Sequence, residues 1–293
     1  MKWTNFSNLP QSIVRAVQFN DRPKAGPNDI SVTTLLRPAQ ARALEAIHDE
    51  EIEQDVADAL YRLHGQSVHS VLERGADATL GDVAEKQFYW PLGNIRVTGR
   101  VDLIEADGTL ADFKTTSVYS FLLGDKDDWT AQANMYRWLA EKNGHKINKL
   151  RIIALLRDWQ KSKVGPDDPD YPTVPMKVKE LEMWPMEKTE QFIRARIEAH
   201  LLASKDASSV PCTAEERWER KGAFAVMKPG GKRSMRNLPT KDEAEAYIKN
   251  TGLTNLKIEE RLSVQTRCLS YCLAAPWCEQ KKAMDAEKST KTA

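Results

Sequence analysis

The segment from Val97 to Thr116 constrains the fold of this chain more than any other stretch. Apolar residues alternate along its first half, and Asp107-Gly108 is a two-residue turn signal, which together predict a β-hairpin. Side chains two residues apart in a strand share a face, so Asp112 and Lys114 should lie together, with Asp102 on the matching face of the first strand. Two carboxylates this close repel each other unless a cation lies between them. The hairpin therefore predicts a site for Mg²⁺ or Mn²⁺.

Composition sets few limits on function. The chain has 293 residues, of which 41% are hydrophobic and 29% charged, as in an ordinary globular protein. A net charge of +1 means that any binding of nucleic acid must rest on a local basic patch. No stretch approaches the roughly 20 apolar residues that span a bilayer. The N-terminus lacks the pattern of a signal peptide, so we expect a cytoplasmic protein with no membrane partner.

The order of helical and strand patterns predicts a mixed α/β domain followed by a smaller α+β lobe. We expect a core over residues 1–204 with a helical lead-in, a lobe over 205–285 closed by the four cysteines, and a disordered tail over 286–293. Expected helices cover 38–47, 55–74 with an interruption near Gly65, 129–143 with Gly144 as its cap, 186–203 and 240–249. Besides the central hairpin, expected strands cover 85–90, 147–156, 176–184 and 256–261, with a second hairpin over 224–236.

The cysteines are few and unevenly placed. Cys212 stands alone, whereas Cys268, Cys272 and Cys278 lie within eleven residues. In a reducing cytoplasm such a group favours a metal or iron–sulfur site over a set of disulfides. Thiolates at four positions suit an iron–sulfur cluster or tetrahedral Zn²⁺, and buried cysteines without metal are the third alternative.

A basic run lies between these cysteines. From Arg217 to Arg236 the chain holds seven lysines and arginines and one acid, Glu219. Such a run can track a phosphate backbone, with Trp218 or Phe224 available to stack on a base, or it can be the solvated surface of a hairpin. The candidate DNA contacts are Arg217, Arg220, Lys221, Lys232, Arg233 and Arg236.

Four short motifs occur in order along the first half of the chain: Gly65-x-x-x-His69, Gly99-Arg-Val-Asp102, Asp112-Phe-Lys114 and Gln132-x-x-x-Tyr136. Each alone is weak, because acid-x-Lys is common on exposed strands and a single histidine is more often packed structurally. The last pair, at i and i+4, could equally be the polar edge of a core helix. Together they resemble the successive motifs of the PD-(D/E)XK nucleases of the RecB, AddB and Cas4 branch, over residues 30–160. The resemblance implies a restriction-endonuclease-like core with a mixed central sheet flanked by helices.

The resemblance also implies roles for individual residues. His69, Asp102 and Asp112 would be metal ligands, with the Phe113 carbonyl completing the set, and Lys114 would be the catalytic lysine beside Asp102 and Asp112. Three further residues would contact DNA or support the active site: Gln132, Tyr136 and, as a weaker candidate, Glu85.

Relatives of the Cas4 and AddB type hold a [4Fe–4S] cluster with one cysteine before the nuclease core and three after it. The trio at Cys268, Cys272 and Cys278 resembles the later set, although its first gap is three residues where the family commonly has two. The upstream cysteine is absent, because Arg37-Pro38 follows the segment where it would lie. Cys212 is the available fourth ligand, and the arrangement looks like a phage-encoded variant.

We therefore expect a metal-dependent deoxyribonuclease, an exonuclease acting on single strands or the ends of duplex DNA in recombination, repair or replication. The alternatives are a Cas4-like DNA-end processing factor and a DNA-binding module that keeps the fold without cutting. The chain contains no Gly-x-x-x-x-Gly-Lys-Ser/Thr motif, so unwinding would come from a partner. Expected protein partners are a recombinase, a single-strand-binding protein or a helicase.

Overall fold

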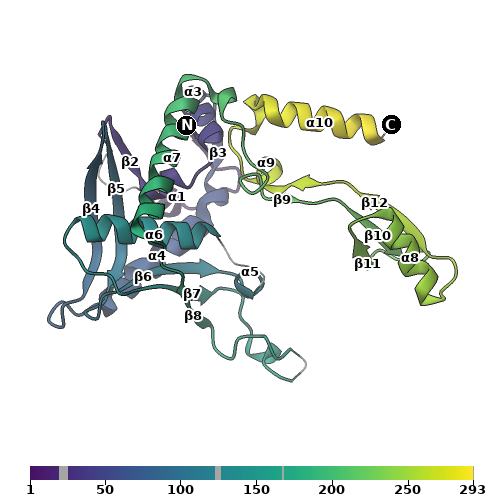
Figure 1. The fold of residues 1–293 in the computed structure, drawn as a ribbon, viewed down its shortest axis with the longest axis horizontal. Coiled ribbons are helices and arrows are strands. Elements are labelled where there is room, and N and C mark those ends of the chain that lie inside the picture. The colour runs from purple at the N-terminus through teal and green to yellow at the C-terminus, as the bar shows by residue number, and fades with distance from the viewer. Residues whose placement is uncertain (20–25, 123–126, 167, 293) are drawn as a thin grey trace. The chain divides into compact units, whose positions relative to one another are not determined.

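The computed structural model describes residues 1–19, 26–122, 127–166 and 168–292 of the chain, and its elements are labelled in Figure 1. The chain divides into two compact units. The first comprises Met1–Arg37 and Asp49–Leu201, and the second comprises Pro38–His48 and Leu202–Ala293.

The first unit is built on a mixed β-sheet. Within the described residues it has six strands in the order β2-β5-β6-β7-β8, with β4 paired to the other edge of β5. β2 is parallel to β5 and β6 is parallel to β7, whereas the remaining pairs are antiparallel. The strands are β2 (Asp29–Ser31), β4 (Val83–Leu92), β5 (Ile95–Ile104), β6 (Thr109–Thr116), β7 (Lys149–Leu156) and β8 (Met176–Leu181).

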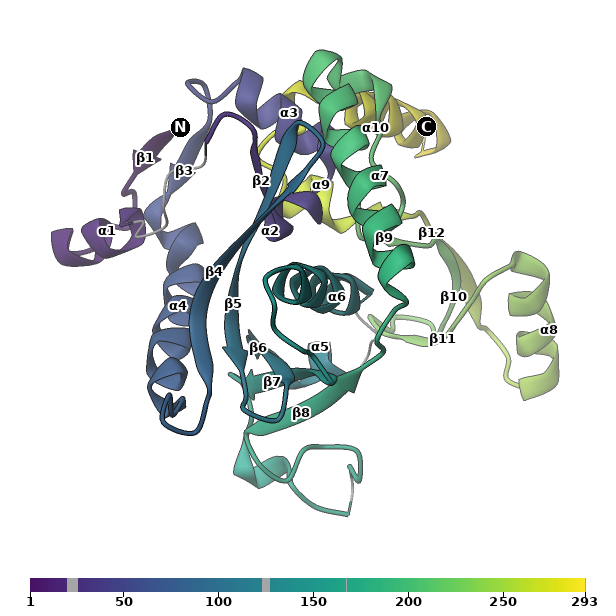
Figure 2. The same cartoon turned by 60° about the vertical axis from the view of Figure 1, so that its left-hand side comes forward.

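Helices cover both sides of this sheet. α6 packs against β4, β5, β6 and β7, while α4 packs against β6, and Figure 2 shows α4 and α6 on opposite sides of the β4–β5 pair. The core under α6 centres on Trp138, Met135 and Leu139, which are fully buried. The helices are α2 (Val32–Leu35), α4 (Leu60–Leu72), α5 (Val118–Leu122), α6 (Asp127–Lys142) and α7 (Met186–Lys205), with 3-10 turns η1 (Val56–Ala59), η2 (Glu73–Gly75) and η3 (Lys161–Lys163).

A small N-terminal layer completes the first unit. β1 (Lys2–Thr4) pairs in parallel with β3 (Glu53–Asp55), and α1 (Gln11–Gln18) packs against α4. Val17, Val56 and Ala59 form its buried centre.

The second unit is an α+β structure. It contains a three-stranded antiparallel sheet in the order β11-β10-β12 and a two-stranded pair, β13-β9. Its elements are α3 (Ala39–Ile47), η4 (Ala207–Ser209), β9 (Glu219–Arg220), β10 (Ala223–Met227), β11 (Ser234–Leu238), α8 (Lys241–Thr251), β12 (Lys257–Arg261), β13 (Val264–Gln265), α9 (Thr266–Ser270), η5 (Ala275–Trp277) and α10 (Glu279–Thr292).

The fold class predicted from the sequence, a mixed α/β core with a small α+β lobe, is confirmed, with differences in detail. α4 runs through Gly65 without interruption, because one glycine inside a helix costs only about 0.5–1 kcal/mol. The connection between β5 and β6 is the four-residue segment 105–108, not two residues, and only Gly108 in it has a positive φ, of 82°.

Two boundaries also differ from those expected. Residues 286–292, expected to be disordered, lie in α10, and the last residue of the expected tail, Ala293, lies outside the described residues. The segment Pro38–His48, expected in the core, groups with the C-terminal part of the chain.

Candidate active site

The site lies where the sheet opens beside β5. One edge of β5 is shared: residues 96–98 pair with β2, whereas Leu103 and Ile104 pair with β6. Between these two contacts β6 diverges from β5, and Asp102 stands at the point of divergence. Its Oδ2 atom accepts a hydrogen bond from the Phe113 backbone N–H at 2.8 Å. The carboxylate thus replaces the backbone carbonyl of a neighbouring strand as the acceptor for this N–H. The opening therefore places the Asp102 carboxylate against the backbone of β6.

Register places three acids in a row across three strands. β4 pairs Ala84 with Leu103 and Lys86 with Val101, which sets Glu85 opposite Asp102. β5 and β6 pair Leu103 with Ala111, which sets Asp102 beside Asp112. Such a row of carboxylates is unfavourable on its own because like charges directly opposite each other destabilise a sheet.

Glu85, Asp102 and His69 form a compact group of possible metal ligands. One ligand atom from each lies within 4.8 Å of the others, and this is the one such group of three or more among the described residues. His69 reaches the sheet from α4, and its Nδ1 atom is 3.4 Å from Asp102 Oδ2. The side chain of Asp102 is 12% exposed, so the group lies under the surface but stays accessible.

Glu85 has an unusual backbone. Its φ is 48°, in the left-handed region that costs about 1–3 kcal/mol for a residue other than glycine. The ladder between β4 and β5 skips the Glu85–Asp102 pair, so the backbone turns there and directs the carboxylate toward Arg100, whose Nε is 2.9 Å from Glu85 Oε2. Sequence reasoning treated Glu85 as a weak candidate and missed Arg100. The alternation of Arg100 with Asp102 on one strand face was the available signal.

Asp112 and Lys114 form the second part of the site. Asp112 is 3% exposed, and its Oδ2 atom is 2.6 Å from the Lys114 Nζ atom. Lys114 also donates to Gln132 Oε1 at 2.9 Å, and Gln132 Nε2 donates to the Tyr136 hydroxyl at 3.4 Å. Gln132 and Tyr136 thus project from one face of α6 and orient the lysine.

Burial and neighbouring charges raise the pKa of three side chains in the site. Burial, with the nearby charge of Asp102, holds the pKa of Asp112 above its ordinary value although Lys114 acts in the opposite direction. Burial and the charge of Asp102 likewise raise the pKa of Glu85. Burial alone would lower the pKa of His69, but its contact with Asp102 and the charge of Asp112 raise it. The site therefore holds excess negative charge that a cation would neutralise.

The donor set fits a divalent cation. Carboxylate oxygens and a carbonyl are the ligands that Mg²⁺ and Mn²⁺ prefer, and His69 adds one nitrogen donor. Phe113 contributes in addition: the N–H and C=O of one strand residue point to the same edge, so its carbonyl faces the opening that its N–H faces.

The cysteines lie together in the second unit. Cys212, Cys268, Cys272 and Cys278 line one cavity, which is completed by α3 residues, among them Gln40 and Leu44, and by the start of α10. All four are free thiols. Burial, with the charge of Glu216, raises the pKa of Cys212 to about 12, and burial raises the pKa of Cys268 and Cys272 as well.

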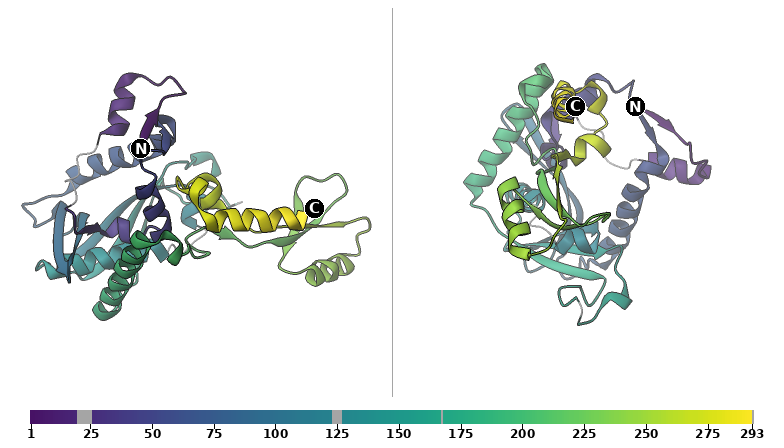
Figure 3. Two further views of the ribbon diagram at one scale, coloured as in Figure 1. Left: turned by 90° about the horizontal axis from the view of Figure 1, so that it is seen from above. Right: turned by 90° about the vertical axis from the view of Figure 1, so that its right-hand side faces the viewer.

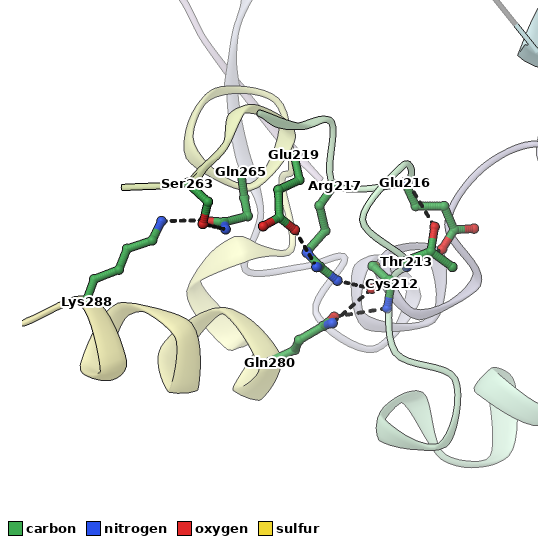
Figure 4. A network of polar contacts seen from close by, with 9 residues as sticks. All are labelled: Cys212, Thr213, Glu216, Arg217, Glu219, Ser263, Gln265, Gln280 and Lys288. Carbon is green, nitrogen blue, oxygen red and sulfur yellow. Dashed lines mark hydrogen bonds and ion pairs between the residues drawn. The ribbon is translucent and has the colours of Figure 1, made fainter. Parts of the chain in front are cut away.

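Polar contacts fix the backbone of Cys212 (Figure 4). Its N–H donates to Gln280 Oε1 at 3.0 Å and its carbonyl accepts from Gln280 Nε2 at 2.9 Å. Arg217 donates to the same carbonyl and forms an ion pair with Glu219 at 2.7 Å. Buried Gln40 accepts from the Cys212 N–H at 3.3 Å, and its Oε1 atom lies 3.9 Å from Cys278 Sγ. No sequence pattern indicated the two glutamines.

Some residues of the basic run pack against other side chains, and the others are exposed to solvent. Arg217 is half-buried against the cysteine loop, and Arg236 stacks on Tyr247 with 5.8 Å between its guanidinium and the ring. Trp218, a candidate stacking residue, packs edge-to-face on Tyr271 and under Arg267. The remaining candidates are exposed, namely Arg220, Lys221, Lys232 and Arg233.

Comparison with known proteins identifies the family. The model of the PD-(D/E)XK nuclease superfamily matches residues 31–279, so the chain belongs to this superfamily of metal-dependent nucleases. Among solved structures the chain is similar to the one described as "Crystal structure of SSO0001", with 16% sequence identity, a TM-score of 0.43, and coverage of 64% of this chain and 83% of that one. Comparison with curated proteins gave no match. In the parts of the chain that the structure describes, no helix has the length and apolar character needed to cross a membrane.

Proposed function

We propose that this protein is a divalent-metal-dependent exonuclease that hydrolyses phosphodiester bonds in DNA. We place it in the RecB, AddB and Cas4 branch, with a role in recombination, repair or replication in a phage or bacterium. The observation that carries the proposal is the convergence of His69, Glu85 and Asp102 beside the Asp112–Lys114 pair, where β5 and β6 diverge.

In this proposal most residues of the site are metal ligands. His69, Glu85, Asp102, Asp112 and the Phe113 carbonyl hold Mg²⁺ or Mn²⁺. When bound, the cation stabilises charge on the phosphate and lowers the pKa of a coordinated water.

Lys114 stabilises negative charge on the scissile phosphate. Its ammonium is held between Asp112 at 2.6 Å and Gln132 at 2.9 Å, so it needs little reorganisation during the reaction. Tyr136 fixes Gln132, which makes both α6 residues positioning residues for the lysine.

A cleavage assay with DNA of different topology tests this function. Purified protein is incubated with linear duplex, linear single-stranded and covalently closed circular DNA, with Mg²⁺, Mn²⁺ or EDTA. We expect cleavage of linear DNA that requires the metal, and intact circles. Cutting of circles would contradict the exonuclease assignment. Metal-independent binding without any cleavage would favour a non-cleaving DNA-binding module instead.

For the second unit we propose that the four cysteines bind a [4Fe–4S] cluster with a structural role. Buried thiols of raised pKa stay protonated unless a cation replaces the proton, and thiolates are the ligands that such clusters use. A zinc ion would require sulfur atoms within about 4 Å of one another. Cys212, Cys268, Cys272 and Cys278 line one cavity, which supports a metal centre shared by all four.

Spectroscopy and metal analysis test the cluster. Protein purified without oxygen should be brown, with broad visible absorption and about four iron atoms per chain. Colourless protein with one zinc per chain would show that the site is a zinc site, and colourless protein without metal would show that the thiols are structural.

A further inference from the structure

The chain between Cys212 and Cys268 forms an arm on a two-stranded ribbon. Arg267 N–H donates to the Arg217 carbonyl at 3.1 Å, and the β9–β13 pairing continues the ribbon outward. β10 and β12 extend it, beginning with the Ala223–Arg261 pair. The strands approach closely at Gly222, where a Cβ atom would lie 2.7 Å from the Arg261 carbonyl oxygen. Figures 1 and 3 show the ribbon joining α9 to the sheet of β10, β11 and β12.

The arm ends in a small folded module. α8 packs against all three strands, with Thr240 as its N-cap and Gly252, at φ 64°, as its C-cap. Ala225, Val226 and Ala244 are fully buried in this module. The module therefore has its own packed centre, which does not depend on its exposed side chains.

The acids of the module are confined to one part of it, whereas its basic residues occur throughout. From Arg220 to Lys241 the sequence holds seven lysines and arginines and no acid. Its acids lie elsewhere, on α8 and β12: Asp242, Glu243, Glu245, Glu259 and Glu260.

The tip of the β10–β11 hairpin concentrates this charge. Lys228, Lys232 and Arg233 are exposed, and among the described residues none of the three takes part in an ion pair. We call these three residues the basic tip. They flank Pro229-Gly230-Gly231, in which Gly230 has a φ of 70° and closes the turn.

We propose that the basic tip binds the sugar–phosphate backbone of DNA. Exposed cations without acidic partners gain free energy from phosphates, because each contact releases counterions condensed on the DNA. The aromatic residues of the module are engaged in its packing: Tyr247 lies under Arg236, and Phe224 is partly buried on β10. The contact is therefore electrostatic and independent of base sequence. The inference rests on the proposed function only in taking DNA as the partner.

Salt-dependent binding of the full-length protein tests this surface. The triple variant Lys228→Ala/Lys232→Ala/Arg233→Ala is compared with wild type by fluorescence anisotropy on a labelled duplex, in EDTA so that nothing is cut. Each lost phosphate contact should lower the slope of log Kd against log salt by about 0.9, so the variant should lose roughly 2.7 in slope. We expect binding at least about tenfold weaker at low salt, with an unchanged circular dichroism spectrum.

A matched variant removes the same charge from other positions of the module. Lys241→Ala/Lys249→Ala/Lys257→Ala deletes three exposed lysines of α8 and β12. It should change the slope by less than about 0.9, the value expected for one phosphate contact. Equal effects of the two triple variants would overturn the proposal, because only net charge would then matter. Wild-type binding by the first variant would overturn it as well.

Cleavage kinetics separate this inference from the nuclease proposal. The basic-tip variant should keep the wild-type maximum rate on saturating DNA and show a raised KM, because it retains every residue of the active site. Loss of maximum rate with unchanged affinity would contradict the binding role. If wild-type protein binds DNA through the tip but never cuts, the nuclease proposal fails and this inference stands.

Discussion

Gly99→Ala should destabilise the core and disturb the active site together. A Cβ atom at position 99 would lie 2.8 Å from Tyr136 Cε1 and 3.1 Å from Leu139 Cδ2. Tyr136 is 6% exposed and Leu139 is fully buried, so neither side chain can move into solvent. Forcing a methyl group into a packed core costs about 1–3 kcal/mol. Movement of Tyr136 would also release Gln132 and thereby Lys114.

Chemical denaturation with a matched glycine variant measures this effect. Gly65 lies inside α4, and a Cβ atom there would meet nothing within 4 Å beyond the backbone of its own helix, so Gly65→Ala should be neutral or stabilise by about 0.5–1 kcal/mol. Gly99→Ala should lower the free energy of unfolding by about 1–3 kcal/mol and slow cleavage even under conditions where the protein is fully folded. Unchanged stability of Gly99→Ala would refute the packing argument, and full activity with lowered stability would refute the link to Lys114.

Further predictions concern the cysteine site. Gln280→Leu leaves both backbone groups of Cys212 without that partner and should destabilise the second unit by about 1–3 kcal/mol in urea unfolding, whereas exposed Lys282→Ala should have little effect. Arg217→Met should lower stability in the same range and leave the salt dependence of DNA binding unchanged, because Arg217 contacts the cysteine loop. Cys212→Ser and Cys272→Ser should lower bound metal and thermal stability about equally, and metal loss from only one of them would exclude the other as a ligand.

Local patterns predicted much of the fold. Apolar alternation along β5 reflects one buried face, and α6 is a long helix buried on most of its sides, so the hairpin and the helix could be located from neighbouring residues alone. The clustering of Asp102, Asp112 and Lys114 followed from the two-residue period of strands in the same way. These features depend on contacts close in sequence.

The remaining features depend on contacts that are distant in sequence. Gln40 meets Cys212 across 172 residues, and Gln280 meets it across 68, so no local period indicates either contact. The left-handed backbone of Glu85 runs against the preference of its residue type and persists only because the surrounding sheet and Arg100 hold it. The divergence of β6 from β5 likewise requires β2 to take over the edge of β5.

Cleavage by Lys114→Ala tests the central claim most directly. Lys114 is 21% exposed and pairs with buried Asp112, so Lys114→Ala should lower stability but still fold and bind DNA, while losing about 10²-fold or more in cleavage rate. Lys86→Ala, which removes an exposed lysine of β4, serves as the control and should cut normally. We expect a folded, DNA-binding and inactive Lys114→Ala protein. Cleavage by Lys114→Ala at the wild-type rate would contradict the assignment of this site.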